Sequence, residues 1–171
     1  MELKLKPISK DGITQAISRI QLYRYLNEPE EAESICRDIL AVEPDHQMAV
    51  RLLAMTISDQ FTGDPSDRFS EAEGLLSALT DPYERLYFTG LLYERKAKTQ
   101  LRAGRPLATL MPLFEEAMRR FSEAEKIRPP ANDDAILRWN RCVRLLESRL
   151  GSEWQHPESE HFEAHDSPPL V

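Results

Sequence analysis

Cysteine is scarce in this sequence: Cys36 and Cys142 are the only two among 171 residues. Each lies within an apolar pattern of helical spacing, so the sequence predicts two buried, reduced thiols and argues against a disulfide framework or a thiolate metal site. Long apolar runs are also missing, because no segment approaches the roughly eighteen apolar residues that would cross a bilayer. The opening segment, residues 1–12, lacks the apolar core of a signal peptide. We therefore expect a cytoplasmic protein that does not associate with membranes.

Patterns typical of catalysis are missing as well. The six glycines are scattered and fall mostly at expected turns, so they form neither a phosphate-binding loop nor a dinucleotide fingerprint. No nucleophile is accompanied by a base and an orienting acid. Carboxylates are plentiful, but no pair stands out from a charged surface as a general acid and base. We expect neither enzyme activity nor a cofactor.

Positive charge is not concentrated in this chain, which has 22 Lys and Arg against 29 Asp and Glu and a net charge of -7. Binding of nucleic acid needs a concentrated positive surface that neutralises phosphates, so we do not expect nucleic acid as a partner. Much of the negative charge follows Gly151, where no Lys or Arg occurs; the acids there are Glu153, Glu158, Glu160, Glu163 and Asp166. Because apolar residues are also sparse in it, residues 151–171 are predicted to be a flexible acidic tail.

This tail contains the only metal-site candidate in the sequence. His161 and His165 are four residues apart, with His156 upstream and acidic residues in between, so a helical tail would place both imidazoles on one face. A solvated acidic tail is the simpler interpretation, since no packed neighbours would orient the imidazoles. We predict no bound metal. Whether the tail docks into the folded body is left open.

Apolar residues recur at helical spacing along the body of the chain, and no stretch shows the alternation of a half-buried strand, so we predict an all-α fold. Helix starts are indicated where a capping residue precedes a Glu by three positions, at Asn27, Ser70 and Asp81. Helix ends are indicated by proline or glycine, at Pro44, Gly104, Pro129 and Gly151. The pattern predicts seven helices, near residues 12–26, 28–42, 45–60, 70–79, 82–103, 109–127 and 132–150.

One spacing recurs and is the most informative feature. Small, large and small residues separated by four and three positions occur as Ala117, Phe121, Ala124; as Ala32, Cys36, Ile39; and, with a second large residue, as Ala72, Leu76, Leu79. Pro129 and Pro44 follow the first two sets at the same offset. A small residue lets a neighbouring helix approach closely while the large one fills the groove. These positions resemble the second-helix signature of the tetratricopeptide repeat (TPR) family.

The first helix of each repeat matches the family less well. Val50, Leu53, Ala54 and Ile57 fit the second repeat, and Leu86, Gly90 and Tyr93 fit the third, whereas the helix near 12–26 has an apolar face without the small residue of the family. The helix at 82–103 is predicted to run about two turns beyond the family norm. If Thr109 caps the sixth helix, Pro112 falls in its first turn.

The resemblance covers about residues 12–150 and implies an α-α superhelix of about three TPR-like helical hairpins plus a C-terminal capping helix. Residues 1–11 would be an N-terminal extension and 151–171 the tail. The segment from Asn132 to Asn140 is similar to one in bacterial TPR proteins. The apolar residues that would cover the last repeat are Ile136, Trp139, Val143 and Leu146. A generic helical bundle is the alternative fold.

In the TPR family, first helices line a concave groove that holds a peptide or a helix. The resemblance implies that the groove-lining residues here are Met48, Arg51, Met55, Ser58, Tyr87, Leu91, Glu94, Arg95, Arg141 and Arg144. Met suits irregular apolar contacts, Tyr can anchor, and Arg pairs with carboxylates, so we expect an acidic or amphipathic ligand. At each position, an ordinary surface or core-edge role is equally consistent with the sequence.

The predicted function is therefore that of a protein-protein interaction adaptor or scaffold, with a protein or peptide as its partner. The alternative is a structural subunit that self-associates into a homo-oligomer and has no separate peptide ligand. Both follow from analogy with the fold, because a superhelix favours binding in general and no particular ligand.

Overall fold

The computed structural model describes residues 3–65 and 67–155 of the chain, and in this part all regular structure is helical. The elements in chain order are a short 3-10 turn η1 (Lys10–Gly12), α1 (Ile13–Tyr25), α2 (Pro29–Val42), α3 (Gln47–Asp59), α4 (Phe69–Ser77), α5 (Pro82–Arg102), α6 (Leu107–Lys126) and α7 (Asp134–Gln155). The predicted all-α class and seven helices are confirmed. No helix in these ranges combines the length and apolarity that crossing a lipid bilayer requires.

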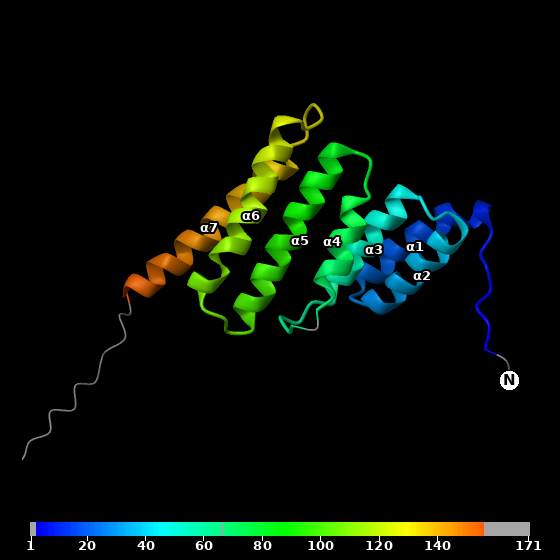
Figure 1. Cartoon of the computed structure of the whole chain (residues 1–171), viewed down its shortest axis with the longest axis horizontal. Coiled ribbons are helices and arrows are strands. Elements are labelled where there is room, and N and C mark those ends of the chain that lie inside the picture. Colours follow the sequence, from blue (N-terminus) through cyan, green and yellow to red (C-terminus); the bar gives the residue numbers. More distant parts are fainter. Residues whose placement is uncertain (1–2, 66, 156–171) are drawn as a thin grey trace, which may run out of the picture.

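The helices follow one another in a row from α1 at one end of the molecule to α7 at the other (Figure 1). Each helix packs against the next one in the chain. A second set of contacts joins alternate helices, α1 to α3, α3 to α5 and α5 to α7, and among the described residues no comparable contact joins α2 to α4 or α4 to α6. The odd-numbered helices therefore lie closer together than the even-numbered ones.

The recurring small-large-small positions form the centre of the core. Ala32, Cys36 and Ile39 on α2, the matching triplet Ala72, Leu76 and Leu79 at α4, and Ala117, Phe121 and Ala124 on α6 are all at most 1% exposed. Each triplet lies on the side of its helix that packs against the odd-numbered helices. The buried, unpaired thiols of Cys36 and Cys142 are confirmed.

The crossing of α5 and α6 depends on Gly90. A Cβ atom at Gly90 would lie 2.7 Å from Cε1 and 2.8 Å from Cδ1 of Phe121, which is closer than real contacts allow. Phe121 is fully buried, so its ring has no room to withdraw. The two helices pack at this distance because the glycine has no side chain.

Some predicted helix ends are confirmed and others are wrong. Asp81 caps α5 as predicted, its Oδ1 accepting a hydrogen bond from the backbone N–H of Glu84 at 2.8 Å. Asn27 does not cap α2, because it has a φ of 60° and the N-cap is Glu28. Ser70 does not cap α4, which begins one residue earlier at Phe69.

The N-cap of α3 is His46, which the sequence signals did not indicate. Its Nδ1 accepts a hydrogen bond from the backbone N–H of Ala49.

The last two helices also depart from their predicted ends. α6 begins at Leu107 with Pro106 as its N-cap, so Thr109 is not the cap and Pro112 lies inside the helix. α7 continues through Gly151 to Gln155, so the predicted end at Gly151 is wrong. Gly151 does not have the positive φ with which Gly104 follows the end of α5, and a glycine in helical conformation does not end a helix.

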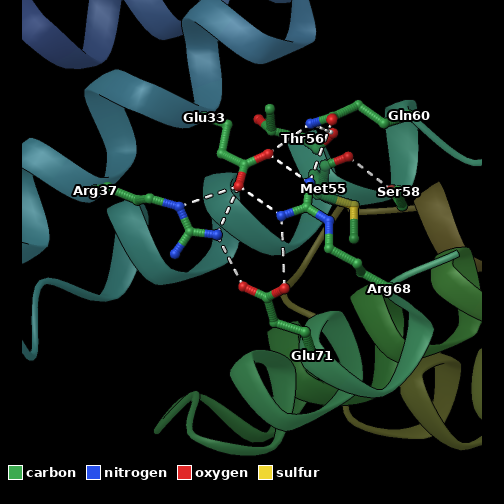
Figure 2. Close-up of polar contacts among 8 residues, drawn as sticks. All are labelled: Glu33, Arg37, Met55, Thr56, Ser58, Gln60, Arg68 and Glu71. Carbon is green, nitrogen blue, oxygen red and sulfur yellow. Dashed lines mark hydrogen bonds and ion pairs between the residues drawn. The ribbon is translucent and has the colours of Figure 1, made fainter. Parts of the chain in front are cut away.

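An ion-pair cluster ties α2, α3 and α4 together (Figure 2). The carboxylate of Glu33 on α2 accepts two bonds from Arg68 at 2.7 and 2.6 Å, two from Arg37 at 3.0 and 2.6 Å and one from Gln60 at 2.7 Å. Glu71 on α4 accepts a further bond from Arg37 at 2.9 Å. Because α2 and α4 have few direct contacts, this cluster fixes their relative position.

Candidate functional site

A basic depression of about 330 Å³ lies where α3, α5 and α7 meet. We call it the basic pocket. Its lining residues are Ser58, Asp59, Phe61, Arg95, Lys98, Thr99, Arg102 and Arg138. Four of these are cationic and one is anionic, in a chain whose net charge is -7. Positive charge is therefore concentrated here against the overall balance of the protein.

One wall of the basic pocket is fixed by Arg95. Its Nη1 donates to the hydroxyl of Ser58 at 2.6 Å, to the backbone carbonyl of Met55 at 3.1 Å and to Oδ1 of Asp59 at 2.5 Å. Arg24 on α1 donates to Oδ2 of the same aspartate at 2.6 Å. Burial lowers the pKa of Arg95, and the neighbouring Asp59 acts in the opposite direction. Arg95 thus joins α5 to α3 and is committed to structural contacts.

Glu94 does not line the basic pocket, but it contacts two residues that do, and its side chain is only 1% exposed. Its Oε1 pairs with the ammonium of Lys98 one turn along α5. Its Oε2 lies 3.7 Å from Nη1 of Arg138 on α7, too far for a hydrogen bond, and accepts no hydrogen bond from any described residue. This buried carboxylate therefore holds Lys98 and attracts Arg138 toward the pocket.

Two cations of the basic pocket remain available for a ligand. Arg102 is exposed and has no ion-pair partner among the described residues. Arg138, whose side chain is 42% exposed, has the long approach to Glu94 and a side-chain hydrogen bond with Tyr87, but no short ion pair. Two guanidinium groups at one depression can donate paired hydrogen bonds to carboxylate oxygens. The basic pocket can thus bind an anionic group without breaking a short ion pair.

A second depression, of about 250 Å³, lies at the other end of α5 and is aromatic. Tyr83 and Tyr87 stack there with ring centroids 5.8 Å apart and planes at 6°. The guanidinium of Arg51 lies 5.0 Å from the ring centroid of Phe88 and pairs with Glu84. We call this the aromatic pocket. It offers aromatic ring surface and one cation beside the carboxylates of Asp81, Glu84 and Asp134, which suits an apolar side chain on a ligand and not an anionic one.

The structure divides the ten residues predicted to line a groove. Arg51 and Tyr87 lie at the aromatic pocket, and Ser58 and Arg95 line the basic pocket. Met55 and Leu91 are 3% and 5% exposed and belong to the core. Glu94 is 1% exposed and is likewise buried. Met48 is exposed on α3, and Arg141 and Arg144 are exposed on α7. Contact of these ten residues with a partner stays a prediction.

The sequence interpretation missed Lys98, Arg102 and Arg138. A signal existed for the first two, since Arg95, Lys98 and Arg102 are spaced by three and four and so share one face of α5. Lys98 and Arg102 lie on the part of α5 that extends beyond the usual TPR helix length, which made the family pattern uninformative there. Arg138 had no local signal, because only the packing of α7 on α5 brings it to the pocket.

No group of three or more metal-binding side chains occurs in the described ranges of the chain. The candidate ligands His156, His161 and His165 lie outside the described residues, so that alternative stays untested. Burial raises the pKa of both thiols, Cys36 and Cys142, to about 12, so neither is poised for metal binding or nucleophilic attack at neutral pH.

Comparison with known proteins adds no relative: no protein-family model, no curated protein and no solved structure matches this chain.

Proposed function

We propose that this chain is a TPR-like adaptor that binds an acidic or amphipathic segment of another protein along the wall formed by α3, α5 and α7. The observation that supports this most directly is the basic pocket, where neither Arg102 nor Arg138 is held in a short ion pair. Such a pair favours carboxylates over uncharged ligands by electrostatic complementarity.

The contacts between alternate helices support the TPR-like arrangement. In a curved stack of hairpins, the first helices lie on the inner side and approach one another, while the second helices spread apart on the outer side. The contacts α1–α3, α3–α5 and α5–α7, without comparable ones among α2, α4 and α6 in the described part of the chain, follow that pattern.

The aromatic pocket extends the proposal to an amphipathic ligand. Tyr87 and Arg102 are fifteen residues apart on α5, so about 22 Å of helix separates the apolar end of the wall from its basic end. A ligand with an apolar anchor and an acidic cluster at that separation would contact both pockets. The buried Leu91 and Glu94 lie between them and supply no open contact surface.

The test is affinity purification from the source cells with full-length bait. Arg102→Glu combined with Arg138→Glu should reduce recovery of a direct partner by about 10- to 100-fold, because two charge-assisted contacts become repulsive. Arg102 is exposed, so Arg102→Glu alone should keep its melting temperature and lower recovery in the same direction. Arg138→Glu brings a second carboxylate toward the buried Glu94, so the double variant should melt at a lower temperature, and its recovery is compared at a temperature where it is folded. Arg51 is a poorer choice for substitution, since its loss would also leave Glu84 unpaired.

The matched control is Lys6→Glu combined with Arg19→Glu, which makes the same charge change at exposed positions near the opposite end of the row of helices. A partner recovered equally with the wild type and both double variants would contradict the proposal.

The self-associating subunit remains the second candidate, and one observation favours it. Leu22 and Tyr25 on α1 and its C-cap residue Leu26 lie at positions i, i+3 and i+4 and are 40%, 87% and 52% exposed, so the end of the first helix presents an apolar stripe to solvent. Light scattering on the same samples distinguishes the two functions: a concentration-independent monomer excludes the self-associating subunit.

A further inference from the structure

The chain itself contains a segment with the chemistry that the basic pocket would bind. Residues 156–171 include Glu158, Glu160, Glu163 and Asp166 and have no Lys or Arg. This segment follows directly on α7, the helix that contributes Arg138 to the pocket. Its negative charge opposes the concentration of positive charge at the meeting point of α3, α5 and α7.

The course of the last three helices places the start of this segment at the correct end of the molecule. α6 runs antiparallel to both α5 and α7, so α5 and α7 end on the same side (Figure 1). Lys98 and Arg102 lie in the last turns of α5, and Gln155 ends α7. Segment 156–171 therefore begins on the side of the molecule where the cationic end of α5 lies.

The segment is also long enough to reach the pocket. Arg138 precedes Gln155 by seventeen residues, which corresponds to about 26 Å along α7. The sixteen residues from 156 to 171 can span about 50 Å when extended. Less than the full segment is needed to return from Gln155 to Arg138 and place several carboxylates beside the two guanidinium groups.

The other large depressions of the described structure fit this segment less well. The one between α6 and α7 is lined by Glu115 and Glu123 as well as by Arg119 and Lys126, and Arg119 already pairs with Glu116 and Glu123. The one at the end of α2 is lined by Glu43 and Asp45 together with a single lysine, Lys10, and His46. Carboxylates that line a depression repel an acidic ligand, so charge selects the basic pocket.

We infer that residues 156–171 occupy the basic pocket of their own chain and compete there with acidic partners. This inference rests on the proposed function, because it assigns a second, internal ligand to the same site. A tethered segment acts at an effective concentration in the millimolar range, so even weak binding in the free form keeps the pocket largely filled. An external partner must then displace the segment. The apparent affinity of the partner is its intrinsic affinity multiplied by the fraction of pockets that the segment leaves empty.

The experiment uses full-length protein and, as probe, a fluorescent synthetic peptide of residues 156–171, with binding followed by anisotropy at low salt. The test variant removes the four charges of the segment: Glu158→Gln, Glu160→Gln, Glu163→Gln and Asp166→Asn. It should bind the probe at least 10-fold more tightly than the wild type does. Adding Arg102→Glu and Arg138→Glu to the test variant should abolish that binding.

The control removes four exposed carboxylates from the helical body: Glu28→Gln, Glu31→Gln, Glu125→Gln and Glu147→Gln. It makes the same change in net charge and should bind the probe as weakly as the wild type, which separates occupation of the pocket from the effect of overall charge. Binding of the probe that rises equally in control and test variants would overturn the inference.

Two further outcomes would overturn it while leaving the proposed function to its own test. In the first, the test variant and the wild type bind the probe equally, or neither binds it, although recovery of a cellular partner still depends on Arg102 and Arg138. In the second, the difference between test variant and wild type appears only where light scattering shows dimers, which would place the segment on a second copy.

Discussion

Glu33 shows how much of this structure depends on one charged side chain. Its carboxylate is 12% exposed and accepts hydrogen bonds from Arg68, Arg37 and Gln60. The bonds from Arg68 are the main reason why its pKa falls from 4.5 to about 2; burial acts against them, and Gln60 and Arg37 add to them. Glu33 therefore stays ionised between the helices it connects.

Replacing Glu33 with Gln should destabilise the protein by about 2 kcal/mol at neutral pH, because the guanidinium groups of Arg68 and Arg37 lose their shared carboxylate. The folded pKa lies below the unfolded one, so this contribution is fully present above pH 4.5 and is lost as the pH falls from 4.5 toward 2. Urea unfolding of both proteins across that range measures the difference, which should be constant above pH 5.5 or so and should shrink in acid.

The control is Glu31→Gln, two residues earlier on α2 at an exposed position, where the expected change is a few tenths of a kcal/mol. A Glu33→Gln variant as stable as the Glu31→Gln variant at neutral pH would show that the cluster adds nothing.

Residue roles were predictable from the sequence where the residue is apolar and periodic. Burial of Cys36, Cys142 and the small-large-small triplets followed from their spacing. Glu33 was not predictable, because its partners Gln60 and Arg68 are 27 and 35 residues away and charged residues on a helix are usually solvated. Long-range pairing of charges leaves no periodic trace in a single sequence.

At the scale of the helix, α5 connects the core to the proposed binding wall. Its N-terminal half contributes Tyr83 and Tyr87 to the aromatic pocket, and its C-terminal turns contribute Lys98 and Arg102 to the basic pocket. Between them Gly90 packs against Phe121 of α6. The position of both pockets therefore depends on how closely α5 approaches α6.

Substituting Gly90 with Ala should destabilise the protein by about 1–3 kcal/mol, because the added methyl group would overlap the buried ring of Phe121. Gly74→Ala on α4 should instead stabilise it by about 0.5–1 kcal/mol, since that glycine is also helical but has no atom within 4 Å of an added Cβ. Thermal or urea unfolding of the two variants measures both changes. Equal stabilisation by both substitutions would rule out the close crossing.

The ends of the helices were less predictable from the sequence than the presence of each helix. The Asp81 cap was predicted correctly because its side chain bonds to its own helix. The signal at Ser70 was misleading, because this residue does not cap α4. The signal at Gly151 was also misleading, because α7 continues through this glycine to Gln155. A local capping signal competes with the continuation of a helix, and tertiary packing decides which prevails.

At the scale of the whole molecule, α7 closes one end of the row of helices (Figure 1). It buries Ala135 and Cys142 at 1% and 0% exposure, and Leu145 and Leu146 pack partly against the core. Of the predicted contact residues, Ile136, Val143 and Leu146 are half-buried and Trp139 is 37% exposed. The face of α7 that covers the core is therefore centred on Ala135 and Cys142, slightly around the helix from the predicted face.

Deleting the chain from Asn132 onward should expose the apolar face of α6 and α5 that α7 covers, and we expect the shortened protein to aggregate and to melt at a lower temperature. Light scattering and thermal unfolding measure the two effects. A shortened protein that stays monomeric with an unchanged melting temperature would show that α7 is dispensable to the fold.

The sequence by itself determined the all-helical class, the number of helices and the residues of the repeated core, because helical periodicity and small-residue spacing are local properties of the chain. Only the tertiary structure decided that the expected groove is divided into an aromatic and a basic pocket, since Leu91 and Glu94 are buried between them. It also decided that Arg138 joins Arg102, because charges on helices far apart in the sequence meet only when α5 and α7 pack side by side.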